Sequence, residues 1–301
     1  MITVLIPLQN LQEPWSIDLK RIIITAAFTL LIAGICRAEA KIMLNSNIVK
    51  EGGVVKALLY SDKPFSGSEV KFMGEKYPVF FRNYDKAAKE FTFLALVPVP
   101  LETSGVKKLH IRYLMNGREY EHTEKIEVKK ISAGRSDVQT GGKRAELGVN
   151  FGPENKIIKK RQEKRTPIKF DLPFIKPAEG EITSAFGKKR TYDGGSYGST
   201  HKGVDIANKQ GTKVAAANHG VVVEAATMKG HGVTVIIDHG GGLYSLYFHL
   251  KGVYVKKGVE VKKGDIIATM GSTGVSTGPH LHWQMNLFGI PVSPMDFTTM
   301  M

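Results

Sequence analysis

The stretch VAAANHGVVVEAATMKGHGVTVIIDHGGGLYSLYFH, residues 214–249, decides the fold class of this chain. It contains four short apolar runs with turn-forming residues between them: residues 214–217, 220–225, 233–238 and 243–249. Short runs rich in β-branched and aromatic residues are typical of strands. This half of the chain shows no helical period of 3.6 residues. We therefore predict an antiparallel β domain with long surface loops.

The predicted β domain extends beyond that stretch in both directions. Gly-rich, strand-like segments begin after residue 173, and residues 255–258 and 261–265 predict a strand–turn pair closer to the C-terminus. We assign residues 174–301 to this domain.

A second β domain is predicted for residues 41–131. Apolar side chains alternate with others in residues 91–97 and again in residues 111–115, which is the period of a half-buried strand. Asn116-Gly117 then predicts a tight hairpin turn. Repeated turn signals favour a small β-sandwich of immunoglobulin-like type. This domain has no catalytic constellation, so we expect a spacer, a binding module or a cover for an active site.

The segment between the two domains, residues 132–173, has a different composition. It has few large apolar residues, and basic side chains crowd its second half: Lys156, Lys159, Lys160, Arg161, Lys164 and Arg165. This composition predicts an extended, solvated linker. We expect a flexible tether that an anionic cell wall would attract.

Residues 1–40 have the pattern of a secretory signal peptide. Lys20 and Arg21 precede an apolar run over residues 22–35, and the AEA triplet at 38–40 supplies small residues for a signal peptidase. We expect cleavage after residue 40 and an exported protein, either periplasmic, associated with the cell envelope or secreted. The run is shorter than the roughly 20 apolar residues of a membrane span, so a retained anchor is the second choice. Membrane contact is expected only if that segment is retained.

Cys36 is the only cysteine and lies within the signal pattern. The mature chain therefore has no intrachain disulfide, and any metal ion must be held by imidazoles and carboxylates. A lipoprotein would need a small residue directly before the cysteine, and Ile35 stands there instead.

The chain is basic, with 42 Lys and Arg residues against 28 Asp and Glu residues. A net charge of +14 implies an anionic partner such as nucleic acid, a membrane surface or cell wall. The basic residues are spread along the chain, and no nucleic-acid-binding motif is present. The sequence thus argues against a nucleic-acid partner.

Two histidine motifs in the C-terminal domain have the spacing of metal ligands. His201 and Asp205 are four residues apart, and His280 and His282 are two apart, so each pair can share one face of an extended segment. A catalytic zinc ion takes three ligands from His and carboxylate side chains and keeps one position open. His201, Asp205 and one member of the 280/282 pair meet that count. The remaining imidazole and His249 could serve as general base and oxyanion donors.

A histidine is more often an ordinary core or surface residue than a ligand, and either motif alone would be a weak signal. The occurrence of both in one β domain, flanked by glycines, favours a metal site. For His219, His231 and His239 we expect structural roles, since each adjoins a glycine at the end of a predicted strand or in a turn.

Four motifs in order resemble the signature of the lysostaphin-type or LytM-domain zinc metallopeptidases. They are SAFG at 184–187, HKGVD at 201–205, YFHL at 247–250 and GSTGVSTGPHLH at 271–282. The resemblance covers roughly residues 176 to 297. It implies a compact antiparallel β fold and an enzyme that cleaves peptide stems or cross-links of peptidoglycan. Residue by residue, it implies that His201, Asp205 and His282 bind Zn²⁺ and that His249 and His280 are the catalytic histidines.

The sequence departs from the family pattern at one place, and one alternative function stays open. Trp283 and Gln284 stand where the family often has Phe-Glu, which puts contacts of the substrate groove in doubt rather than catalysis. Some family members have lost zinc ligands and only activate other wall hydrolases. A non-catalytic factor that binds the wall and activates another hydrolase is therefore the alternative, although the full ligand set is present here.

Other functional classes lack their motifs. The chain has no HExxH and no GxSxG, and Cys36 comes too early to be a nucleophile of the mature protein. Residues 261–268 resemble biotinyl and lipoyl carrier domains, but no lysine stands at a matching hairpin tip. We interpret that similarity as shared β-turn sequence.

Overall fold

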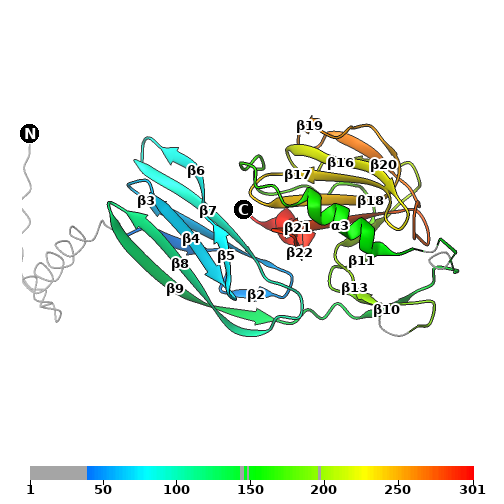
Figure 1. Cartoon of the computed structure of the whole chain (residues 1–301), viewed down its shortest axis with the longest axis horizontal. Coiled ribbons are helices and arrows are strands. Elements are labelled where there is room, and N and C mark those ends of the chain that lie inside the picture. The colour runs from blue at the N-terminus through cyan, green and yellow to red at the C-terminus, as the bar shows by residue number, and fades with distance from the viewer. Residues whose placement is uncertain (1–38, 143–145, 148, 196–197) are drawn as a thin grey trace, which may run out of the picture. The chain divides into compact units, whose positions relative to one another are not determined.

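The structure is a computed structural model that describes residues 39–142, 146–147, 149–195 and 198–301. Residues 41–301 form one compact unit (Figure 1). The predicted signal segment lies outside the described residues, apart from its last two positions. Within the described ranges, the structure contains no helix with the length and apolarity that a membrane span requires.

Residues 41–129 form two sheets. One has the strand order β1-β3-β7-β6, and the other has β2-β9-β8-β4-β5. Ser61 of β3 donates from its Oγ to Met115 Sδ of β8 at 3.0 Å, so the two sheets meet across a buried interior. The strands are β1 Lys41–Leu44, β2 Ile48–Lys50, β3 Val54–Ser61, β4 Gly67–Phe72, β5 Glu75–Pro78, β6 Phe80–Asp85, β7 Glu90–Pro98, β8 Gly105–Met115 and β9 Arg118–Lys129. The immunoglobulin-like type of this arrangement stays a prediction.

The predicted hairpin joins β8 and β9. Asn116 and Gly117 both have positive φ values, 53° and 72°, and Met115 pairs directly with Arg118. Two consecutive residues in this conformation make the two-residue turn whose twist matches that of the strands. The sequence prediction of a hairpin here is confirmed.

The prediction of an extended linker over residues 132–173 is wrong for its middle part. This segment contains β10 (Arg135–Val138) and helix α3 (Phe151–Arg161). Asn150 caps the helix by accepting from the Gly152 N–H at 2.9 Å, and Ile158 is buried against the sheet. Phe170 is also buried. The N-cap and the three basic residues in the last turn stabilise the helix itself, so these few apolar side chains suffice to dock it.

The C-terminal part is built on a ten-stranded sheet with the main order β11-β14-β21-β18-β17-β16-β19. The pairing within it is antiparallel throughout, as the sequence predicts. Its strands are β11 Glu181–Ser184, β14 Val204–Ala207, β15 Lys213–Ala215, β16 Gly220–Met228, β17 Gly232–Asp238, β18 Leu243–Val253, β19 Glu260–Val261, β20 Ile266–Met270, β21 His280–Leu287 and β22 Ile290–Val292. A three-stranded sheet combines β10 with β12 (Lys189–Tyr192) and β13 (Ser199–Thr200), and α4 (Pro294–Thr299) follows β22.

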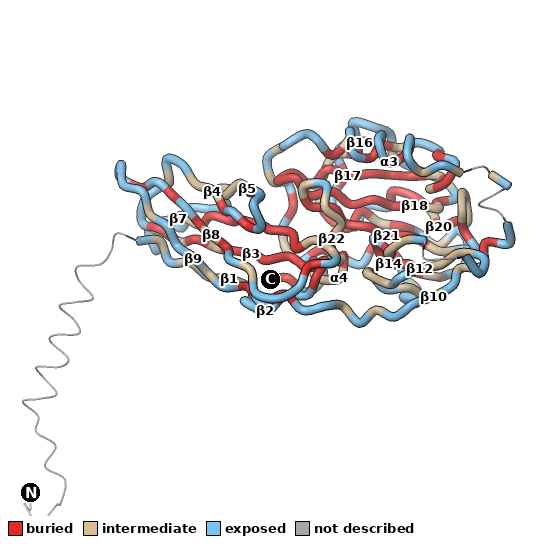
Figure 2. Tube along the Cα trace, turned by 60° about the horizontal axis from the view of Figure 1, so that its bottom comes forward, coloured by how far each residue is buried: buried red, intermediate tan, exposed pale blue. Residues whose placement is uncertain are grey.

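The central strands of the large sheet are buried on both faces, as Figure 2 shows for β17, β18 and β21. On one face, Leu281, Trp283 and Met285 of β21 enter the main hydrophobic core. On the other face, a smaller cluster contains Ile158 of α3 and Phe248 of β18. The alternation of side chains therefore turns His280, His282 and Gln284 toward the face that α3 partly covers.

Candidate functional site

Strand register brings two of the expected ligands face to face. Asp205 of β14 pairs directly with His282 of β21, and Phe248 of β18 pairs with His282 from the other side. Asp205 Oδ1 lies 2.8 Å from His282 Nδ1. The two side chains converge because residues directly opposite each other in adjacent strands share a face of the sheet.

His201 reaches the same point from the segment that enters β14. Its Nε2 lies 3.0 Å from Asp205 Oδ1 and 3.0 Å from His282 Nδ1. This approach requires Gly203, since a Cβ there would lie 2.4 Å from the Trp283 carbonyl oxygen and 2.7 Å from His282 Nε2. A side chain at position 203 would therefore displace the segment that carries His201.

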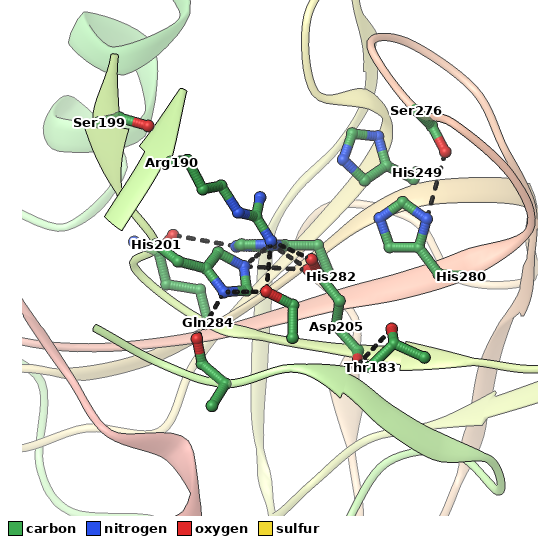
Figure 3. Close-up of polar contacts among 12 residues, drawn as sticks. Thr183, Arg190, Ser199, His201, Asp205, His249, Ser276, His280, His282 and Gln284 are labelled. Carbon is green, nitrogen blue, oxygen red and sulfur yellow. Dashed lines mark hydrogen bonds and ion pairs between the residues drawn. The ribbon is translucent and has the colours of Figure 1, made fainter. Parts of the chain in front are cut away.

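The hydrogen bonds on the far side of each imidazole determine which nitrogen carries the proton. His201 Nδ1 lies 2.9 Å from the Ala185 carbonyl oxygen, which can only accept, so Nδ1 donates and Nε2 holds a lone pair. His282 Nε2 lies 3.4 Å from Gln284 Oε1, which leaves the lone pair on Nδ1. Nε2 of His201, Nδ1 of His282 and Oδ1 of Asp205 thus converge on one place (Figure 3). Such a set of donors calls for a cation.

The donor set fits a zinc ion. Ligand atoms of His201, Asp205 and His282 all lie within 4.8 Å of one another, and all three residues are buried. Zinc–ligand bonds of about 2.0–2.1 Å in a tetrahedral arrangement separate neighbouring ligand atoms by about 3.3 Å. The observed separations of 2.8–3.0 Å are within a few tenths of an ångström of that value. Two imidazoles and one carboxylate also match the ligand types of catalytic zinc sites.

His249 and His280 lie beside this cluster. Their ring centroids are 4.8 Å apart, and the His249 ring is 6.3 Å from the His282 ring. His249 Nδ1 donates to the Thr273 carbonyl at 2.8 Å, and His280 Nδ1 donates to the Gly278 carbonyl at 2.9 Å. Both rings therefore keep an unprotonated Nε2. His249 adopts this position with a φ of 61°, an uncommon conformation for a residue other than glycine.

Burial and charge set the ionisation of the cluster. Burial alone would raise the pKa of Asp205, but the adjacent imidazoles of His201 and His282 hold this pKa well below its usual value. Burial lowers the pKa of His282 and of His280. Burial, with the neighbouring His280 and His282, lowers the pKa of His249 strongly. An anionic carboxylate is the state of Asp205 that binds a divalent cation.

Arg190 of β12 is a member of the site that the sequence analysis did not identify. Its Nη2 donates to Asp205 Oδ2 and, at 2.8 Å, to Ser184 Oγ. The two oxygens of Asp205 are therefore divided between the imidazole pair and the guanidinium. In the sequence, only the position of Arg190 shortly after the SAFG motif could have suggested its role. The contact with Asp205 depends on the path of β12, which the sequence does not show.

Trp283 and Gln284, the two positions at which the sequence departs from the family pattern, are both buried. Trp283 is fully buried in the main core, and Gln284 is 8% exposed. Gln284 instead contacts the far nitrogen of His282. The three remaining histidines of the domain stay outside the cluster. His231 contacts Glu154, His239 contacts Ser245, and the imidazole of His219 lies 3.8 Å from Asp171.

The comparison with known proteins agrees with this geometry. Residues 199–294 match the sequence model of peptidase family M23. An M23 peptidase structure from Pseudomonas aeruginosa is 26% identical and has a TM-score of 0.59, over 85% of this chain and 96% of that chain. Peptidoglycan DD-endopeptidase ShyA of Vibrio cholerae is 38% identical over 114 residues, which are 38% of this chain and 26% of that protein.

A further relative carries the name of a lipoprotein. The NlpD/LppB homologue of Pseudomonas aeruginosa is 38% identical over 122 residues, or 40% of this chain and 38% of that protein. The chain thus spans between about a quarter and two fifths of the length of these two curated relatives. The matched region holds His201, Asp205, His249, His280 and His282, so the C-terminal part of this chain is a peptidase M23 domain of the LytM and lysostaphin type.

Proposed function

We propose that this chain is a zinc-dependent endopeptidase that hydrolyses peptide bonds in the stems or cross-links of peptidoglycan. In this proposal His201, Asp205 and His282 hold Zn²⁺, and His249 and His280 are the catalytic residues. The observation that carries the proposal is the convergence of two imidazole lone pairs and one carboxylate oxygen within 2.8–3.0 Å of one another.

The zinc ion, when bound, lowers the pKa of a coordinated water to about 7 and polarises the carbonyl of the scissile bond. The chain supplies the proton transfers. Nε2 of His249 and Nε2 of His280 are unprotonated, so either can accept the proton that the attacking water releases. The same nitrogen, once protonated, can donate to the leaving amine or to the oxyanion. Their lowered pKa values keep both rings neutral, and therefore ready to accept, at pH 7.

The names of the relatives support the substrate class. ShyA and ShyC of Vibrio cholerae are named peptidoglycan DD-endopeptidases, and the matched segment of ShyC is 32% identical over 145 residues. A net charge of +14 favours adhesion to an anionic wall. We accordingly propose a location in the cell envelope or periplasm, with peptidoglycan as the partner.

The test is turnover on purified peptidoglycan by the zinc-loaded protein, with mass analysis of the released fragments. Cross-linked dimers cut at a peptide bond, together with about one zinc ion per chain, would support the proposal. The alternative is a non-catalytic LytM-type factor that binds the wall and activates another hydrolase. Stoichiometric binding to the wall without fragments, and stimulation of a second hydrolase on mixing, would favour that alternative.

A further inference from the structure

A line of buried amide side chains runs from His282 to helix α3. His282 Nε2 faces Gln284 Oε1 at 3.4 Å, and Gln284 Nε2 donates to Asn286 Oδ1 at 2.8 Å. Asn286 Nδ2 then donates to Gln162 Oε1 at 3.0 Å. Gln284, Asn286 and Gln162 are 8%, 5% and 4% exposed. Water therefore does not supply the partners of these amides, and each member depends on its neighbour.

The direction of the donors along this line decides the state of His282. Gln284 and Asn286 each donate from the amide nitrogen to the next oxygen along the line, so the oxygen of Gln284 is the atom that meets the imidazole. An oxygen there keeps the proton on His282 Nε2 and the lone pair on Nδ1. The reverse order would place an amide N–H against Nε2 and move the imidazole proton to Nδ1, where it would occupy the place of a metal bond.

The far end of the line is fixed by the helix. Gln162 is the C-cap of α3, and its backbone N–H donates to the Lys159 carbonyl. The first turn is anchored separately, since Glu154 accepts from the Gly230 N–H at 2.8 Å and lies 2.6 Å from His231 Nδ1. Arg161 also pairs with Glu224 of β16 at 2.7 Å. Figure 1 shows α3 lying across the sheet. The position of Gln162 is therefore determined by contacts at both ends of the helix.

We propose that Gln284, Asn286 and Gln162 are positioning residues that hold His282 with Nδ1 toward the metal ion, and that α3 is by this route part of the metal site. This inference rests on the proposed function, because it assigns His282 to the metal. It extends the functional unit upstream of residue 174 to the segment that the sequence suggested was a tether. Partners that orient a metal-binding imidazole typically change metal affinity by 10–100-fold when they are removed.

The test compares substitutions at position 284 in the full chain. Gln284→Met keeps the length of the side chain and removes the acceptor, whereas Gln284→Glu keeps an acceptor. We expect Gln284→Met to weaken zinc binding about 10–100-fold in competition with a chelator. The visible absorption of the Co²⁺-substituted protein should change as well, because the imidazole is free to rotate. Gln284→Glu should bind zinc at least as tightly as the wild type.

Two more variants separate an effect of the amide line on zinc binding from a general loss of stability. Asn286→Leu should weaken zinc binding in the same direction as Gln284→Met. Asn218→Leu is the control, since Asn218 is a fully buried amide whose partners, Asp171 and His219, lie away from the cluster. It should lower the melting temperature and leave the zinc affinity and the Co²⁺ spectrum unchanged.

The outcomes separate this inference from the proposed function. Wild-type affinity and spectrum in Gln284→Met, or failure of Gln284→Glu to retain binding, would overturn the positioning role while the zinc site stands. A wild-type protein that binds no zinc would overturn the proposed function itself.

Discussion

Asp205 and His282 face each other across the β14–β21 pair, with Asp205 Oδ1 2.8 Å from His282 Nδ1. The proposed metal site is therefore built into the register of the sheet, and a one-residue slip would turn both side chains away from each other. Only His201 comes from outside a strand, and Gly203 lets its segment approach.

Loss of one ligand should abolish both metal binding and activity. In Asp205→Ala, the two imidazoles lose the anionic partner that neutralises the cation, so we expect less than one tenth of the wild-type zinc content after dialysis. His201→Ala should behave in the same way. Zinc content is measured by elemental analysis, with exposed Asp62 replaced by Ala as the control. Full zinc occupancy in either ligand variant would show that the assignment is wrong.

The catalytic histidines should be separable from the ligands. His249→Ala should retain zinc and lose turnover by about 10²–10⁴-fold, because it removes a proton-transfer group and no metal ligand. The same result is expected for His280→Ala. The measurement pairs zinc content with the rate of fragment release from peptidoglycan. An unchanged rate in His249→Ala would exclude this residue from catalysis.

The close approach at Gly203 should not tolerate a methyl group. Gly203→Ala would place a Cβ 2.4 Å from the Trp283 oxygen, so we expect destabilisation of about 1–3 kcal/mol and weaker zinc binding. Gly252→Ala is the matched control within the same sheet, since its Cβ would lie 3.6 Å from Thr269 Oγ1, an ordinary contact. Urea denaturation of the two variants should differ accordingly, and equal midpoints would contradict the steric argument.

Two adjacent isoleucines test whether α3 is docked. Ile158 is 7% exposed in the cluster under the helix, whereas Ile157 is 42% exposed. Ile158→Ala should therefore cost about 2–4 kcal/mol, because it leaves a cavity, and Ile157→Ala should cost less than about 0.5 kcal/mol. Chemical denaturation measures both. Similar small losses in the two variants would mean that the segment is a solvated tether after all.

The buried imidazole of His239 should make stability depend on pH. Burial lowers its pKa to about 4, so the native state keeps it neutral while the unfolded chain protonates below about pH 6.5. The contribution of neutral His239 to the free energy of unfolding is complete above pH 6.5 and is lost as the pH falls toward 4. The loss between pH 7 and pH 5 amounts to about 2 kcal/mol. His239→Gln should flatten the pH dependence of the unfolding free energy by that amount. Parallel curves for variant and wild type would rule out this role.

Much of the C-terminal fold followed from the sequence. The apolar runs at 220–225, 233–238 and 243–249 lie within β16, β17 and β18, and the two-residue spacing of His280 and His282 put both on one face of β21. These features depend on local periodicity, which a sequence shows directly. The convergence of His201 with that strand needed either the resemblance or the structure, because it depends on pairing between distant segments.

Helix α3 was missed for a different reason. Its signals are present, with Asn150 at the N-cap, Glu154 in the first turn and basic residues in the last turn. The apolar stripe is thin, and the charge of the segment favoured a linker. Glu154 is buried and its carboxylate is bound by backbone N–H groups of the turn between β16 and β17, which no pattern within the helix could indicate. The roles of Arg190 and Gln284 likewise depend on contacts between elements.

Main-chain oxygens orient the imidazoles of His249 and His280, since the carbonyls of Thr273 and Gly278 accept from them. Every residue has a backbone carbonyl group. Replacing the exposed side chain of Thr277, which lies between Thr273 and Gly278, therefore leaves these acceptors in place. The side chains of this loop can therefore be exchanged while its backbone path, and with it the orientation of both imidazoles, is conserved.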